Sequence, residues 1–435
     1  MDKTKVAIVG VGTVGAGVAR ILLDHGDRTA KNAGTTLWLE TAVVRDLAKP
    51  RDCDLPDGVL TDDIQDVINN DEIKVVVQLI GGVEAARTIM LELLESGKDI
   101  VTANKALIAE HGPELFAKAR ELGRSIAFDA AVAGGIPIIT NLTQCLAANQ
   151  VTSLRGILNG TSNFIVSQME QGADYDGAVA EAQRLGYAEA DPAMDVDGTD
   201  AAQKLAILAH IAYGAEIDWK KIPKTGIDTL DTVDLKYAEE LGYKIKLLAV
   251  AQMSDDGLEL HVSPTLVKAG LPLAEVRSAY NAISVEGDQV GRLFYHGLGA
   301  GQKPTASAVV ADLIDTAVGR TALTFRTLKL FTEHNPSVQI CPSEKIVGRY
   351  YFRFVVADEP GVLADITRIF GTHNISIASV IQHEPDENET QAEGVYVPLV
   401  IMTHTACEGE AESALTEIND LPNVRPGSRK MRVLN

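Results

Sequence analysis

The chain has 435 residues, 46% hydrophobic and 23% charged, which is ordinary for a globular enzyme of about two to four domains. A formal net charge of −21 disfavours nucleic acid and anionic membranes as partners, and no apolar run approaches the roughly 20 residues of a membrane span. Four widely spaced cysteines, no C-x-x-C pair and no recognisable signal peptide predict a reducing, cytoplasmic setting without disulfides.

A glycine-rich loop near the N-terminus stands between a predicted strand and a predicted helix. The apolar run 5–9 is typical of a buried strand, and the loop G-V-G-T-V-G follows it directly. In this setting Gly10 permits a tight turn, Gly12 allows a pyrophosphate to approach the backbone, and Gly15 allows close helix packing. The loop therefore predicts a dinucleotide site with the phosphates at the helix N-terminus.

Strands and helices then alternate, which predicts a Rossmann-type, doubly wound parallel sheet. Lys105 follows one of these strands, at the sheet edge where ligands bind. Arg45 and Asp46 follow the second strand: the arginine favours the 2′-phosphate of NADP and the acid favours the 2′-hydroxyl of NAD. Both cofactors stay open, with a preference for NADP. After the first strand, the predicted strands are 37–44, 75–80, 99–102 and 126–128, and the predicted helices are 85–96 and 115–122.

The stretch 129–139, D-A-A-V-A-G-G-I-P-I-I, is small, apolar and rich in glycine. One interpretation is a close-packed crossover between domains, and the residue types favour it. The other is a turn whose carbonyl groups face a ligand or an ion.

A second domain is predicted from about residue 149 to residue 302. Its strand candidates, 247–253, 258–262 and 282–286, lack βαβ alternation, which predicts an α+β domain. A further glycine loop ends at Gly301, and the helix starting near Pro304 is expected to return to the cofactor site.

The stretch 186–204 is acidic and ends in a helix, with Thr199 as a candidate N-cap. Asp200 and Lys204 are four positions apart and share one helix face. One interpretation is a surface salt bridge under a solvated acidic loop, since such pairs are common. The other is a lysine held by a carboxylate in order to handle a proton.

The C-terminal part, 349–435, follows a linker predicted at 326–348. Its pattern is β-α-β-β-α with a final strand, which predicts a ferredoxin-like domain.

These motifs, taken in order, resemble the homoserine dehydrogenase family. The carriers are the N-terminal glycine loop, T-A-N-K at 102–105, G-I-L-N-G-T at 156–161, G-Y-A-E-A-D-P at 186–192, D-x-x-x-K at 200–204, and G-x-G-A-G-x-x-P-T-A-S at 297–307. The turn D-E-P-G-V-L at 358–363 resembles that of an ACT domain. No kinase domain precedes the dehydrogenase, so the chain resembles the monofunctional form. The resemblance implies a nucleotide-binding domain over 1–136 with a return helix at about 304–325, a catalytic and dimerisation domain over 137–303, and an ACT domain over 349–435.

The resemblance also implies a reaction, the reversible NAD(P)H-dependent reduction of L-aspartate 4-semialdehyde to L-homoserine on the route to threonine, methionine and isoleucine. The family's proton-transferring lysine corresponds to Lys204 and its second active-site lysine to Lys105. Its substrate-contacting acids correspond to Glu189 and Asp200. Its cofactor contacts correspond to Gly10, Gly12, Thr13, Val14, Gly15, Lys105, Gly186 and Gly301, to which the strand pattern adds Arg45.

Further implications are a sodium ion, an amino-acid effector and an oligomer. The sodium ion would bind Asp129 and the carbonyl groups of Val132, Gly134 and Ile136. Many relatives have glutamate at the first of these positions, so the shorter acid puts the ion in doubt. An effector such as threonine would contact Gly361, Val362 and Asn374 in the ACT domain, and the assembly would be a homodimer or homotetramer.

Two other functions stay open at this point: a dehydrogenase for a related amino-acid semialdehyde, and a catalytically silent amino-acid sensor. The ACT domain itself could serve only to assemble the oligomer.

Overall fold

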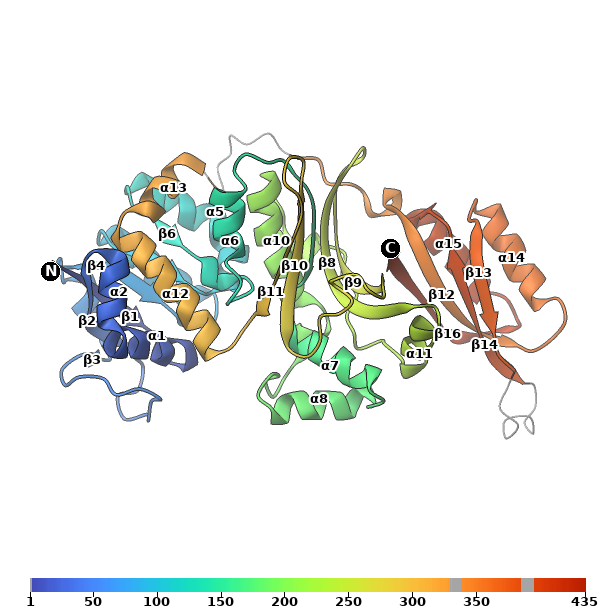
Figure 1. The fold of residues 1–435 in the computed structure, drawn as a ribbon, viewed down its shortest axis with the longest axis horizontal. Coiled ribbons are helices and arrows are strands. Elements are labelled where there is room, and N and C mark those ends of the chain that lie inside the picture. Colours follow the sequence, from blue (N-terminus) through green and yellow to red (C-terminus); the bar gives the residue numbers. More distant parts are fainter. Residues whose placement is uncertain (1, 329, 331–337, 385–394) are drawn as a thin grey trace. The chain divides into compact units, whose positions relative to one another are not determined.

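The structure is a computed structural model that describes residues 2–328, 330, 338–384 and 395–435 (Figure 1). The chain divides into two compact units. The first consists of Met1–Leu154, Asp200–Ile222 and Ala279–Val338, and the second of Arg155–Thr199, Pro223–Ser278 and Gln339–Asn435.

The first unit contains a six-stranded parallel sheet in the order β3-β2-β1-β4-β5-β6, which confirms the predicted Rossmann-type sheet (Figure 1). The strand order reverses between β1 and β4, the switch point at which such sheets bind their ligands. The sequence reading missed β3, which has only two residues. The strands are β1 Lys3–Val9, β2 Thr36–Val43, β3 Leu60–Thr61, β4 Ile73–Gln78, β5 Asp99–Thr102 and β6 Ile126–Ala127.

Helices cover this sheet, and one of them arrives from far along the chain. Helix α12 packs on α1 so closely that a Cβ atom on Gly17 would lie 2.9 Å from Gln302 Cγ. Val309 and Leu313 of α12 share one apolar core with the sheet residues Val6 and Ile8. The helices of this unit are α1 Thr13–Asp24, α2 Gly26–Ala33, α3 Gln65–Ile68, α4 Glu84–Glu95, α5 Lys105–Glu121, α6 Ile138–Thr140, α10 Thr199–Tyr213, α12 Gln302–Ala317 and α13 Arg320–Leu328.

The first unit also contains the antiparallel hairpin β10 Tyr280–Gly287 and β11 Gly291–Leu298. The sequence reading found β10 but not β11. Strand β11 has no fully buried residue, so it lacks the apolar run by which strands were recognised. Strand β7, Val151–Ile157, contains the point at which the two units divide.

The second unit contains a mixed sheet in which β8-β9-β16-β12-β14-β13 are neighbours. Its last four strands have the 4-1-3-2 order of a ferredoxin-like domain, which confirms that prediction. A parallel pairing of Arg432–Leu434 in β16 with β9 attaches this domain to the β8–β9 hairpin. The strands are β8 Tyr243–Ser254, β9 Gly257–Lys268, β12 Val347–Ala357, β13 Ile377–Gln382, β14 Tyr396–Thr403, β15 Ala406–Cys407 and β16 Val424–Leu434.

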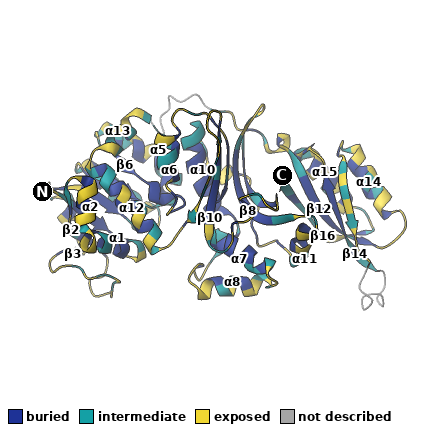
Figure 2. Ribbon diagram, viewed as in Figure 1, coloured by how far each residue is buried: buried dark blue, intermediate teal, exposed yellow. Residues whose placement is uncertain are grey.

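Aromatic side chains fill the core of the ferredoxin-like domain. Phe352 and Phe354 of β12 stack at a centroid distance of 5.9 Å, and Phe370 meets Phe352 edge to face at 5.1 Å. Figure 2 shows β12 largely in the colour of buried residues. The helices of the second unit are α7 Gly160–Glu170, α8 Tyr175–Arg184, α9 Ala193–Val196, α11 Thr232–Glu240, α14 Val362–Thr372 and α15 Glu408–Asn419.

Part of the predicted linker 326–348 lies outside the described residues, namely 329 and 331–337. Its beginning belongs to α13, and its end contains the short 3₁₀ turn Ser343–Lys345 before β12 begins. No helix in the described part of the chain combines the length and apolarity needed to cross a membrane.

Candidate active site

A cavity of about 1220 Å³ opens beside the glycine loop of the first unit. Gly10 has φ +101°, and a Cβ atom on Gly15 would lie 2.1 Å from the carbonyl oxygen of Gly10. Nothing lies within 4 Å of a Cβ atom built on Gly12. Gly10 and Gly15 therefore serve the turn and the packing, whereas Gly12 leaves room for a phosphate beside the start of α1. These features fit a dinucleotide.

The predicted cofactor residues divide between the wall of this cavity and its surroundings. Arg45 and Gly10, Gly12 and Thr13 line it, as do Ile80 and Gly81 after β4. Val14, Gly15, Lys105 and Gly301 are not among its lining residues. Gly301 has φ +111° and precedes the first residue of α12, Gln302, which does line the cavity.

Two further cations in the cavity wall were missed by sequence reasoning: Lys49 and Arg51. Arg51 donates to the carbonyl oxygens of Leu47 at 3.3 Å and Lys49 at 2.7 Å, so it folds the loop after β2 on itself. The oxygen Oδ1 of Asp46 accepts the amide of Ala48 at 2.9 Å. The charge-rich run R-D-L-A-K-P-R-D at 45–52 was the sequence signal that could have identified these two cations.

Asp200 holds two lysines from different helices. Its Oδ2 lies 2.7 Å from Lys204 Nζ, and its Oδ1 lies 2.8 Å from Lys105 Nζ. The side chains of Asp200 and Lys204 are only 5% and 10% exposed, whereas that of Lys105 is 37% exposed. The interpretation of Asp200 and Lys204 as a surface salt bridge is therefore wrong.

The start of α10 fixes the position of Asp200. Asp197, two positions before the helix, fixes its first residue, because its Oδ1 accepts the amide of Thr199 at 2.7 Å. The prediction that Thr199 is the N-cap is wrong, since the helix begins at Thr199 and its hydroxyl donates to Asp197 Oδ2. One turn later, Lys204 faces the same side as Asp200.

The charges of this cluster decide its protonation. Burial alone would raise the pKa of Asp200, but the positive charges of Lys204 and Lys105 outweigh it and hold that pKa well below its usual range. The carboxylate is therefore ionised at working pH and holds one lysine amino group within 3 Å of each of its two oxygens. Such a cluster can donate a proton and stabilise an oxygen that gains negative charge.

Two other predicted site residues belong to the second unit. Gly186, with φ +75°, ends the turn after α8. Glu189 is exposed, and its backbone carbonyl accepts Gln183 Nε2 at 3.2 Å. In the same unit Asn159 caps α7 through Ser162 and donates to Asp195 at 2.7 Å.

The glycine-rich stretch after β6 is tightly packed. A Cβ atom on Gly134 would lie 2.6 Å from the carbonyl oxygen of Gly299, and the amide of Gly135 donates to the carbonyl of Leu298 at 2.9 Å. Ala133 has φ +56°. This stretch is therefore closely packed, as the first interpretation expects.

The predicted sodium ligands belong to this stretch. Asp129 Oδ1 accepts the amide of Thr140 at 3.1 Å, and the carbonyl of Ile136 accepts the amide of Ile138 at 2.7 Å. Each of these oxygens keeps a lone pair, and an all-oxygen set of Asp129, Val132, Gly134 and Ile136 suits a hard cation. Among the described residues, no three histidine, cysteine, aspartate or glutamate side chains form a metal-binding group.

Asp129 lies beside a second buried acid, Asp312 of α12, which sequence reasoning missed. Asp312 Oδ2 accepts the amide of Asp129 at 2.9 Å. Burial raises the pKa of Asp129 to about 6 and that of Asp312 well above its ordinary value. Nothing in the sequence relates these two positions, which are 183 residues apart.

The three predicted effector residues lie at the two ends of α14. Gly361, with φ +100°, is its N-cap, and Val362 is its first residue and is buried. Asn374 follows the helix in the left-handed conformation, with φ +56°.

Comparison with known proteins identifies the family. The chain matches the family model "Homoserine dehydrogenase" over residues 137–314, "Homoserine dehydrogenase, NAD binding domain" over 10–129 and "ACT domain" over 350–423. The homoserine dehydrogenase of Pseudomonas aeruginosa is 43% identical over 442 aligned positions, which cover 100% of this chain and 99% of that protein.

Solved structures of homoserine dehydrogenases have the same fold as this chain. A homoserine dehydrogenase from Thiobacillus denitrificans superposes with a TM-score of 0.91 at 41% identity and covers 100% of this chain and 99% of its own. A hyperthermophilic archaeal homoserine dehydrogenase mutant, solved in complex with NADPH, has a TM-score of 0.60 at 25% identity over 72% of this chain and 97% of its own. The chain belongs to the homoserine dehydrogenase family, whose members are NAD(P)-dependent oxidoreductases acting on a CH–OH group.

Proposed function

We propose that Lys204 delivers the proton when this chain reduces L-aspartate 4-semialdehyde to L-homoserine. The observation that carries this proposal is the buried carboxylate of Asp200, which holds Lys204 at 2.7 Å and Lys105 at 2.8 Å. A bound NADPH or NADH supplies the hydride. The Lys204 ammonium gives its proton to the carbonyl oxygen as the hydride reaches the carbonyl carbon, and the neutral amine then takes a proton from solvent.

Lys105, Asp200 and Glu189 have the other roles in the proposed reaction. The positive charge of Lys105 stabilises the oxygen as its negative charge develops, and Asp200 orients both lysines. Glu189 binds the substrate ammonium group. In the reverse direction a neutral lysine must accept the hydroxyl proton, so oxidation of homoserine is expected to have an alkaline optimum.

The assay that tests this function follows NADPH oxidation with aspartate semialdehyde and is repeated with NADH. Turnover with either cofactor supports the proposal. Folded protein that binds nucleotide but turns over neither would contradict it.

NADP is the proposed cofactor, with Arg45, Lys49 and Arg51 near its 2′-phosphate. The NADPH complex of the archaeal relative supports this choice.

Arg45→Ala is expected to raise KM for NADPH about tenfold and to leave KM for NADH nearly unchanged, because a charge-assisted hydrogen bond contributes about 1.5–3 kcal/mol. Initial rates with both cofactors measure this. The variant Arg277→Ala, exposed in the second unit, is the control, and an equal rise for both cofactors would refute the assignment of Arg45.

A sodium ion bound to Asp129 and the carbonyl groups of Val132, Gly134 and Ile136 is a further part of the proposal. Burial raises the pKa of Asp129 from its ordinary value of 3.8 to about 6. Ionising this residue above pH 6 therefore costs the fold about 3 kcal/mol, and stability declines as pH rises from 4 to 6. Asp129→Asn does not ionise, so its melting temperature relative to wild type is expected to rise over this range.

Sodium reverses that cost, because it binds the ionised carboxylate. Sodium chloride is expected to raise the melting temperature of wild type above pH 6 more than choline chloride does, and Asp129→Asn removes the difference. Asp24→Asn, at the exposed C-terminal end of α1, is the control. If both salts act alike on wild type, there is no sodium site.

We assign the nucleotide-binding role to residues 1–136 with α12, the catalytic and dimerisation role to 137–303, and amino-acid feedback to 349–435. Threonine is the proposed effector, bound near Gly361, Val362 and Asn374. The proposed assembly is a cytoplasmic homodimer or homotetramer.

A further inference from the structure

A closed ring of hydrogen bonds lies where β4 and β5 end. The hydroxyl of Thr102 donates to Gln78 Oε1 at 2.8 Å, and the amide of Asn104 donates to Thr102 Oγ1 at 3.1 Å. The side-chain amides of Gln78 and Asn104 both donate to the carbonyl of Ile80, at 3.5 and 3.1 Å. Gln78 and Thr102 are fully buried, whereas Ile80 and Asn104 are half-buried, so this ring connects the core of the sheet to its surface.

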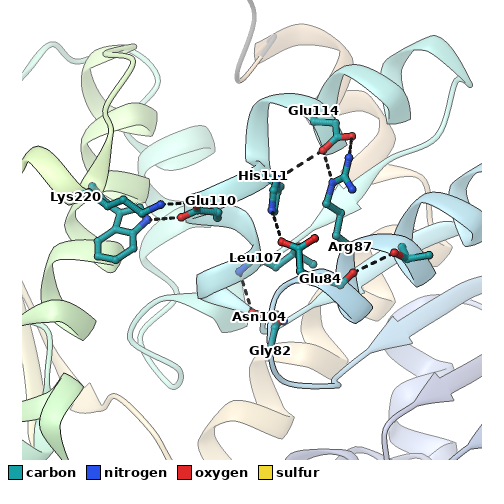
Figure 3. Close-up of polar contacts among 11 residues, drawn as sticks. Gly82, Glu84, Arg87, Asn104, Leu107, Glu110, His111, Glu114 and Lys220 are labelled. Carbon is teal, nitrogen blue, oxygen red and sulfur yellow. Dashed lines mark hydrogen bonds and ion pairs between the residues drawn. The ribbon is translucent and has the colours of Figure 1, made fainter.

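Asn104 extends the ring in two directions, as Figure 3 shows. Its Nδ2 also donates to the carbonyl of Gly82 at 2.8 Å, and its Oδ1 accepts the amide of Leu107 at 3.0 Å, which caps α5. Every hydrogen-bonding atom of this side chain therefore has a partner. The oxygen accepts from the helix, and the amide nitrogen donates twice to the loop after β4.

Asn104 joins the loop after β4 to the start of α5, and both belong to the proposed active site. Ile80 and Gly81 line the nucleotide cavity. Lys105, the residue after Asn104, is the first residue of α5 and reaches Asp200 Oδ1 at 2.8 Å.

We propose that Asn104 is a positioning residue, which fixes the position of Lys105 relative to the loop 80–82. Ile80 and Gly81 of this loop line the nucleotide cavity. The proposal rests on the function proposed above for Lys105. The hydrogen bonds of this side chain indicate more than a helix cap, because a cap needs only an oxygen, which Ser, Thr or Asp can also supply. The two donated bonds to the carbonyls of Ile80 and Gly82 require an amide.

Asn104→Ser and Asn104→Ala separate the two roles. Serine keeps a capping oxygen but loses both donors, whereas alanine loses the cap and the donors. We expect Asn104→Ser to melt close to wild type and yet to lower kcat on the order of 10²-fold, since a misplacement of about 1 Å can cost that much. KM for NADPH is expected to change much less than kcat. Asn104→Ala is expected to lose a similar factor in kcat and to melt lower.

The control is Asp174→Ser, which makes the same kind of change at the N-cap of α8, where Asp174 accepts the amide of Gly177. It is expected to leave kcat unchanged. An Asn104→Ser enzyme with wild-type kcat would show that Asn104 is only a cap and would overturn the proposal.

A double-variant cycle tests whether Asn104 acts through Lys105. In the Lys105→Met background, Asn104→Ser is expected to add little further loss, because the group it positions is gone. A full additional loss would overturn the proposal. Wild-type kcat in Lys105→Met alone would instead reject the function given to Lys105, and this inference with it.

Discussion

Lys204→Met is expected to lower kcat for semialdehyde reduction on the order of 10³-fold, with little change in NADPH affinity. The reduction then lacks its proton donor, whereas the glycine loop that receives the phosphates is untouched. The protein is expected to stay folded, because Lys105 still neutralises the buried Asp200 carboxylate from 2.8 Å. Steady-state rates and the quenching of fluorescence by NADPH measure the two quantities separately.

Lys118→Met is the matched control. Lys118 lies on α5 and pairs with Glu95 at 3.2 Å, outside the proposed site, so this variant is expected to keep wild-type turnover. Most of the turnover remaining in Lys204→Met would place the proton donor elsewhere, and Lys105→Met would then be the variant to test.

Local sequence patterns predicted those parts of the site that depend on short-range geometry. The spacing of Gly10, Gly12 and Gly15 predicted a turn into a helix, because short-range geometry decides both the positive φ of Gly10 and the packing of Gly15 on the carbonyl of Gly10. The four-residue spacing of Asp200 and Lys204 predicted their contact for the same reason.

Contacts between distant segments left no such signal. Lys105 reaches Asp200 from another helix, and only its place at the end of a strand hinted at a shared site. Asp312 contacts Asp129, which is 183 residues away in the sequence, and no local pattern around either residue predicts this contact. Strand β11 was missed because its residues are not buried, so the alternation that reveals half-buried strands is weak there.

Arg353→Met is expected to destabilise the second unit by about 3–5 kcal/mol, the largest effect on stability predicted for this chain. Arg353 of β12 binds Asp234 of α11 through two bonds, Nε to Oδ1 at 2.6 Å and one terminal nitrogen to Oδ2 at 2.9 Å. The hydroxyl of Tyr351 donates to the same Oδ1 at 2.9 Å. Asp234 is fully buried and Arg353 is 5% exposed, so losing the arginine leaves a carboxylate without its counter-charge away from water.

Urea unfolding followed by limited proteolysis of the β12 and α11 segments measures this loss. The double variant Arg353→Met with Asp234→Leu is expected to recover most of the stability, because two apolar side chains can replace a buried ion pair at little cost. Arg349→Met on the same strand is the control. Arg349 donates to the carbonyl of Thr403 at 3.1 Å, and its loss is expected to cost much less, because that acceptor is neutral. Equal stability of Arg353→Met and wild type would show that the pair does not hold α11 to the sheet.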